Sequence, residues 1–149
     1  MRKKALFKLT ICATIILSLY SCDFVNWILG TEPNLMFITN KSDFNIGYYV
    51  ADGSLYGNFY PDSLPQTDNN VAPWLEPGKR VILLYNPCST WKRFFEWLPN
   101  DTLSVYIFHS DSLEYYPWDE IRDKYMILKR YDLSLDDVRR MDYEIVYSQ

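Results

Sequence analysis

The chain has 149 residues, about the length of one domain, and its mix of 48% apolar and 23% charged residues excludes a disordered protein. The formal charge is −4, but residues 1–21 hold four bases and no acid. The rest of the chain therefore carries 11 basic against 19 acidic residues, a net charge of −8. This excess of acid excludes nucleic acid as a partner, because binding to phosphates needs a basic patch.

Residues 1–21 have the pattern of an export signal. Residues 1–8 are cationic, and residues 9–20 form an apolar stretch that is shorter than the ~20 residues of a membrane-spanning helix and typical of a signal-peptide core. The alternative is an uncleaved membrane anchor that runs from residue 5 to about residue 22. The basic residues before the stretch and the residues that follow it favour the signal peptide.

The next four residues, Leu19-Tyr20-Ser21-Cys22, resemble the lipobox of bacterial lipoproteins. That motif consists of an aliphatic residue, a tolerant position, a small residue and a cysteine. The resemblance implies that a signal peptidase recognises Leu19, Tyr20 and Ser21 and cuts before Cys22. It also implies that the Cys22 thiol receives diacylglycerol, so that the acylated chain is attached to a lipid bilayer.

The other two cysteines carry little chemistry. Cys12 leaves with the signal peptide and Cys22 carries lipid, so Cys88 is the only free thiol of the mature chain and an intramolecular disulfide is excluded. A nucleophilic Cys88 would need a nearby base, and His109 is the only histidine. We interpret Cys88 as a thiol in a loop.

Residues 22–34 are interpreted as a tether between the lipid and the domain. Five of its residues are unusually apolar for a spacer: Phe24, Val25, Trp27, Ile28 and Leu29. Either they enter the membrane interface, where tryptophan is favoured, or they pack back onto the domain. The sequence leaves both alternatives open.

Residues 35–149 are predicted to form one globular domain, built mostly from short strands separated by turn signals. The expected strands are 35–39, 44–51, 80–85, 103–108, 125–130 and 143–147. Asp52-Gly53 is a hairpin signal, residues 57–72 are a long polar loop, and Glu76-Pro77-Gly78-Lys79 is a turn.

The last third of the domain mixes element types. Residues 110–116 are predicted to be a loop, and residues 118–124 have the charge pattern of a helix after Pro117. A second helix is expected to begin at Ser134, because a hydroxyl N-cap is followed by acids in the first turn and by arginines at the end.

The fold class that follows is mainly β, a single β-sandwich-like domain with short helical inserts near the C-terminus. The alternative is an α+β fold in which the last two helices cover one face of a layered sheet. Four tryptophans are expected in the core or at its edge because of their large apolar area: Trp74, Trp91, Trp97 and Trp118.

The C-terminal stretch Ile127-Leu128-Lys129-Arg130-Tyr131-Asp132-Leu133-Ser134-Leu135-Asp136-Asp137, together with the lipobox, resembles small lipoproteins of gut Bacteroidetes whose function is unknown. The flanking segments 117–122 and 142–147 fit the same group, and the resemblance extends over about residues 34–149. It implies lineage and location, and it supplies no catalytic residue.

Aromatic residues are 17% of the chain, and several lie in or beside loops and strand ends. Exposed tyrosine offers a large contact area at low entropic cost. The predicted binding surface consists of Tyr48, Tyr56, Phe59, Tyr60, Tyr115 and Tyr116. The acidic chain favours basic or neutral partners. The competing interpretation is core packing, because adjacent tyrosines on a strand point to opposite faces.

Catalytic and metal sites find little support. Asp119/Glu120/Asp123, Asp136/Asp137 and Asp111/Glu114 are paired acids, and a glycosidase uses two carboxyls that face each other across a cleft, but acids in a first helical turn also serve as caps. Asp62, Asp68, Asn69 and Asn70 match no calcium-loop spacing, and one histidine with one free thiol does not make a zinc site. We expect no catalytic residue, no metal and no cofactor.

The leading hypothesis is a non-enzymatic lipoprotein, anchored to a membrane of the cell envelope, that binds an envelope protein or glycan. The outer membrane is favoured over the inner one, although Asp23 after the lipid cysteine fits inner-membrane retention in some bacteria. One alternative is a hydrolase that acts on glycans through paired carboxylates. Another is an envelope inhibitor or immunity protein whose inserting loop is residues 57–72.

Overall fold

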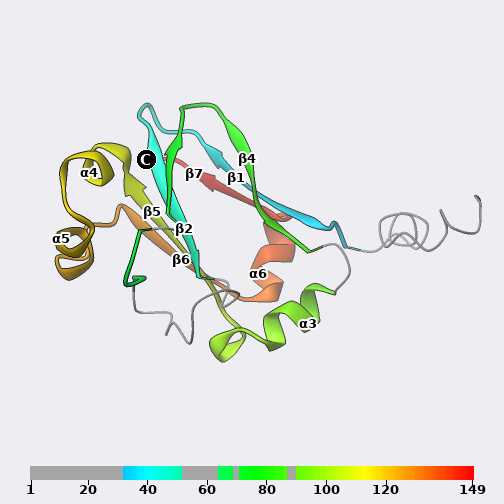
Figure 1. The fold of residues 1–149 in the computed structure, drawn as a ribbon. Helices are drawn as coiled ribbons and strands as arrows, with labels where there is room; N and C mark the ends of the chain where they lie inside the picture. The colour runs from blue at the N-terminus through cyan, green and yellow to red at the C-terminus, as the bar shows by residue number, and fades with distance from the viewer. Residues whose placement is uncertain (1–31, 52–63, 69–70, 87–89) are drawn as a thin grey trace, which may run out of the picture.

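The computed structural model describes residues 32–51, 64–68, 71–86 and 90–149 (Figure 1). The elements in chain order are β1 (Leu35–Asn40), β2 (Ile46–Ala51), β3 (Ala72–Leu75), β4 (Arg80–Tyr85), α3 (Trp91–Glu96), η1 (Pro99–Asp101), β5 (Leu103–His109), α4 (Ser110–Tyr115), α5 (Trp118–Asp123), β6 (Lys129–Leu133), α6 (Leu135–Arg140) and β7 (Glu144–Tyr147). The predicted signal peptide, Cys22, most of the tether, Asp52-Gly53 and Cys88 lie outside the described residues.

The strands form two sheets. The three-stranded sheet has the order β4-β1-β7, and β1 pairs antiparallel with β4 and parallel with β7. The four-stranded sheet has the order β3-β2-β5-β6 and is antiparallel throughout. The mainly-β fold with short helical inserts is confirmed.

The main core lies between the two sheets. Met36 and Ile38 of β1 alternate inward and meet Val105 and Ile107 of β5, and all four side chains are fully buried. Inner faces of two stacked sheets interdigitate in this way in β-sandwiches. One end of this core is closed by helices, with Trp91 and Phe95 supplied by α3 and Val138 supplied by α6.

The four-stranded sheet is covered on its other face as well. Tyr106 and Phe108 alternate with the inward residues of β5 and are also fully buried, in a second, smaller core that includes Ile121 of α5. A central strand buried on both faces reads as a continuous apolar run. As a result, α4 and α5 form a third layer of the molecule on the outer face of this sheet (Figure 1).

A polar corner joins the two sheets at the turn before β4. The buried Asn40 side chain donates from Nδ2 to the carbonyls of Phe44 and Leu75, each at 2.8 Å, and so fixes the end of β1 to the end of β3. In the predicted turn, the Lys79 N–H donates to the Glu76 carbonyl at 3.1 Å, and Gly78 has φ 74°. A positive φ at the third turn residue requires glycine in a type II turn, so the turn prediction is confirmed.

Several local predictions were wrong. Residues 110–115 are the helix α4 instead of a loop, and β6 covers Lys129–Leu133 instead of 125–130. The strand β3 (residues 72–75) was not predicted, and it overlaps the expected loop 57–72 only at residue 72. The helix α3 was not predicted. Trp91 is buried and Trp118 is half-buried, as expected, but Trp74 is 54% exposed and Trp97 is 70% exposed.

Candidate binding surface

The helices α4 and α5 are positioned by local sequence signals at the end of β5. The backbone N–H of Asp111 donates to Nδ1 of His109 at 3.2 Å, so His109 acts as the N-cap of α4. Pro117 then separates α4 from α5. It is the N-cap residue of α5, where the missing backbone N–H of proline costs nothing. The next residue, Trp118, packs edge-on against Phe108 with 5.8 Å between ring centroids.

Residues 64–68 are held against α5 by long-range contacts. Nε1 of Trp118 donates to the Pro65 carbonyl at 2.8 Å, and the Arg122 guanidinium donates to the Gln66 carbonyl at 3.3 Å. Leu64 is buried in the smaller core. These contacts place the acidic residue Asp68 beside the two helices.

A small pocket of about 150 Å³ lies where this segment meets the two helices. Its lining residues are Asp68, Val71, Leu113, Tyr116, Trp118 and Ile121. Five of these six residues are aromatic or aliphatic, and Asp68 contributes the only formal charge among them. A cation is attracted both by a carboxylate and by the face of an aromatic ring, so the pocket is suited to a small organic cation.

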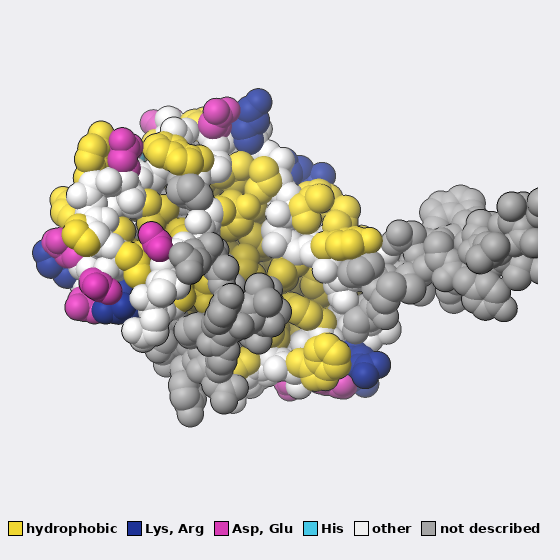
Figure 2. All heavy atoms as spheres, in the orientation of Figure 1, with side chains coloured by type: hydrophobic (Ala, Val, Ile, Leu, Met, Phe, Trp, Pro, Cys, Tyr) yellow, Lys and Arg dark blue, Asp and Glu magenta, His cyan; other side chains and the backbone are white. Residues whose placement is uncertain are grey.

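The surface around the pocket is acidic. Acidic side chains gather over α4 and α5 in Figure 2. The two bases of α5 and its C-terminal end are already paired: Arg122 contacts Asp119 at 2.8 Å, and Lys124 contacts Glu120 at 2.6 Å, a contact that raises the Lys124 pKa. Within the described part of the chain, no cation pairs with Asp68 or Glu114, so the local field attracts positive groups.

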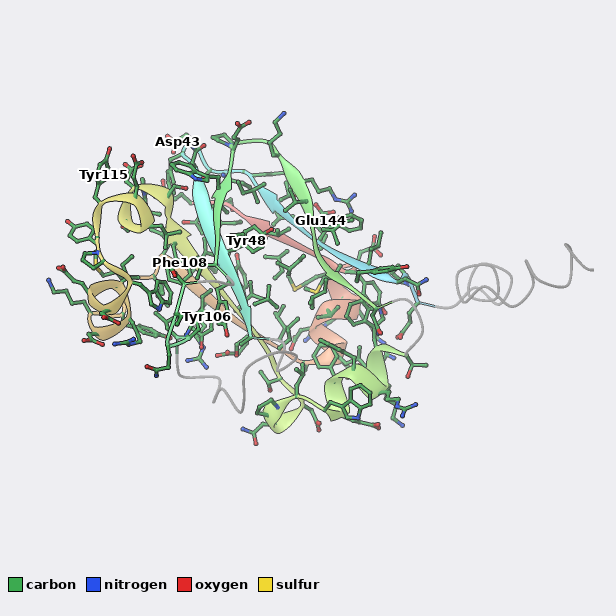
Figure 3. All side chains as sticks on the ribbon, in the orientation of Figure 1. Asp43, Tyr48, Tyr106, Phe108, Tyr115 and Glu144 are labelled. Atoms are coloured by element: carbon green, nitrogen blue, oxygen red, sulfur yellow. The ribbon has the colours of Figure 1, made fainter. Side chains whose placement is uncertain are left out.

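The structure separates the aromatic residues of the predicted binding surface. Tyr116 lines the pocket, and Tyr115, which is 72% exposed, points outward from the end of α4 (Figure 3). Tyr48 instead lies between β2 and β4 (Figure 3), where it packs against the main core and burial raises its pKa. Tyr56, Phe59 and Tyr60 lie outside the described residues.

Trp118 and Asp68 are pocket residues that the sequence prediction did not assign to binding. Trp118 was expected in the core and Asp68 in a solvated loop. The one available signal was the run Tyr115-Tyr116-Pro117-Trp118, in which three aromatic residues surround a proline. A proline in such a run prevents a continuous helix and directs its neighbours to different sides of the chain.

One acid of the hydrolase alternative, Asp136, lies beside a groove. A groove of about 410 Å³ between α3 and α6 contains Glu96, Asp101 and Asp136. However, the Asp136 side chain is 84% exposed and pairs with Arg139 at 3.3 Å. A glycosidase needs one carboxyl with a raised pKa, which requires burial or a neighbouring negative charge. No observation therefore favours this alternative.

Within residues 32–51, 64–68, 71–86 and 90–149, no group of three or more His, Cys, Asp or Glu side chains is placed to hold a metal ion. The helices in those same ranges are all too short or too polar to span a bilayer.

No protein family, curated protein or solved structure matches the chain.

Proposed function

We propose that this protein is a lipid-anchored binding module of the bacterial cell envelope. The lipobox around Cys22 supports the anchor. The pocket lined by Tyr116, Trp118 and Asp68 is the observation that carries the binding function. In this proposal the domain has no enzymatic activity and binds an envelope protein through the face formed by α4 and α5.

The ligand group that this pocket suits best is a lysine or arginine side chain of the partner. Its positive head would meet the Asp68 carboxylate, and its aliphatic stem would lie against Tyr116 and Trp118, since long cationic side chains bury their stems on apolar surfaces. Tyr115 and the acids of α4 would surround that contact. A basic partner also fits the net charge of −8 after residue 21.

The test is binding of a short peptide with one central lysine, compared with the same peptide carrying norleucine, whose side chain lacks the charge. Binding is followed by NMR chemical shifts of the purified protein. We expect the lysine peptide to shift signals of residues 113–121, and Asp68→Asn to weaken its binding about tenfold, which corresponds to ~1.4 kcal/mol for one charged contact.

Two matched variants serve as controls. Asp43→Asn removes an exposed acid from the loop between β1 and β2, and Tyr85→Ala removes an exposed tyrosine from β4. Both should bind the lysine peptide as the wild type does, whereas Tyr116→Ala should bind it weakly. Equal binding of the lysine and norleucine peptides, or shifts confined to residues outside the pocket, would contradict the proposal.

A further inference from the structure

The groove between α3 and α6 has an apolar floor and a charged rim. Its residues are Lys92, Phe95, Glu96, Asp101, Ser134, Leu135, Asp136 and Arg139. Phe95 and Leu135 belong to or pack against the main core, so the floor is fixed by the fold. A volume of about 410 Å³ is within the ~300–1,000 Å³ of sites that enclose small ligands.

The chain before β1 is fastened to both helices that border this groove. The Glu32 carboxylate accepts a hydrogen bond from the guanidinium of Arg139, in α6, at 2.5 Å. The Pro33 carbonyl accepts one from Nε1 of Trp91, in α3, at 2.6 Å. Burial and the neighbouring Glu32 carboxylate raise the pKa of Tyr143 to about 12, so its hydroxyl stays neutral and hydrogen-bonded beside this contact.

The apolar part of the tether is close to this point in the sequence. Two residues, Gly30 and Thr31, lie between Leu29 and Glu32, so the two positions are at most about 10 Å apart. The preceding segment, residues 24–29, contains five apolar residues and no charge. It is therefore long enough to cover the groove, and a neutral segment suits the apolar floor.

We propose that residues 24–29 dock in the groove between α3 and α6, with Trp27 and Ile28 against Phe95 and Leu135. The contacts of Glu32 and Pro33 hold the chain beside these helices, although Asn34 and Leu35 pair with the end of β4. The occupant is thus the chain's own tether. This inference goes beyond the proposed function, because the α4–α5 pocket lies in a different layer of the molecule.

The test places a benzophenone amino acid at position 28 of the full chain, in vesicles of phosphatidylethanolamine and phosphatidylglycerol. Illumination followed by mass spectrometry identifies what the group contacts. We expect cross-links to residues 92–96 and 135–139. Glu32→Gln should lower their yield about threefold, the scale of one partly exposed ion pair, whereas the matched control Glu76→Gln, in the turn before β4, should leave it unchanged.

Cross-links to lipid acyl chains would show that the segment enters the bilayer, and cross-links to residues 80–85 would show that it covers the three-stranded sheet. Either result would overturn the docking. So would a lack of intramolecular cross-links, or an equal cross-linking yield in Glu32→Gln and in the chain with Glu32 unchanged. None of these results affects binding of the lysine peptide, so a failure here is distinguishable from a failure of the proposed function.

Discussion

At the scale of single residues, Glu144 of β7 shows how one carboxylate can join three strands. Its carboxylate accepts a hydrogen bond from the Thr39 hydroxyl of β1 and pairs with Arg80 of β4 at 3.1 Å. The Arg80 guanidinium lies 3.5 Å from the centroid of the Phe37 ring. The Glu144 pKa is held below its usual range, mainly by the hydrogen bond from Thr39 and to a smaller extent by the contact with Arg80.

We expect Glu144→Gln to lower the free energy of unfolding at pH 7 by about 1 kcal/mol, the low end for a partly exposed charged hydrogen bond. A carboxyl whose pKa is lower in the folded state stabilises the protein at pH values above its unfolded-state pKa of about 4.3. This stabilisation is lost as the pH falls through the folded-state pKa. The variant should therefore lose less stability than the wild type between about pH 5 and pH 3.

Urea denaturation at a series of pH values measures this difference. Glu76→Gln removes one negative charge from an exposed turn and serves as the control. Its free energy of unfolding should depend on pH as that of the wild type does. Parallel curves for Glu144→Gln and the wild type would show that the cluster on the three-stranded sheet contributes nothing to the acid dependence.

At the scale of elements, α6 shows how a six-residue helix is stabilised by a cap at its N-terminus and by one side chain buried in the core. The Ser134 hydroxyl accepts from the Asp137 N–H at 3.2 Å, and the Asp137 carboxylate accepts from the Ser134 N–H at 3.0 Å, which is a capping box. The hydrogen bonds from Ser134 lower the Asp137 pKa. Val138 fastens the same helix to the core.

Ser134→Ala should destabilise the domain by about 1 kcal/mol, the usual cost of losing a hydroxyl N-cap. So short a helix depends on its cap and on tertiary packing, because a single turn has little stability of its own. Thermal unfolding followed by circular dichroism measures the change. Ser148→Ala, at the exposed C-terminal end, should unfold as the wild type does, and equal midpoints for the two variants would contradict the role of the cap.

The elements that the sequence predicts well carry their signals locally. The helix at Ser134, the turn at Gly78 and the strand from Leu103 depend on caps, turn chemistry and apolar runs within a few residues. The strand β3 contains Pro73, which is unusual inside a sheet but tolerated at an edge, and β3 is an edge strand. The α4 helix is capped by a histidine, which is not a typical N-cap residue.

The displaced strand β6 and the exposed tryptophans have another cause. Tyr125 adopts φ 51°, a left-handed conformation that interrupts an extended chain and that sequence patterns do not reveal in a bulky residue. Trp74 and Trp97 are exposed although their size favours burial, because burial depends on which elements cover a position. The centroid of the exposed Trp97 ring lies 5.2 Å from the guanidinium carbon of Arg93.

At the scale of the whole molecule, the candidate site depends on contacts between residues far apart in the sequence. Trp118 and Pro65 are separated by 53 positions, and Arg139 and Glu32 by 107. Tyr115 and Tyr116 could be proposed for binding from composition alone, but Asp68 could not be assigned to the same site without the fold. Tyr48 shares their residue type and packs in a different layer.

The anchor itself is tested with Cys22→Ser in the full chain. Without a thiol no diacylglycerol can be attached, and the lipoprotein peptidase has no substrate. We expect the variant to keep its signal peptide, to migrate as a larger species on a denaturing gel, and to lose incorporation of labelled fatty acid. Cys88→Ser, which removes the other thiol after residue 21, is the control and should be processed normally. Unchanged size and labelling in Cys22→Ser would contradict the lipid anchor.

The described chain begins beside α6, whereas α4 and α5 lie at the opposite side of the molecule (Figure 1). A domain of this length has a radius of gyration of about 14 Å. Features on opposite sides of such a domain lie roughly 30 Å apart, so the aromatic pocket is far from the point at which the described chain begins. A partner that occupies the pocket would therefore leave residues 32–34 and the start of β1 uncovered.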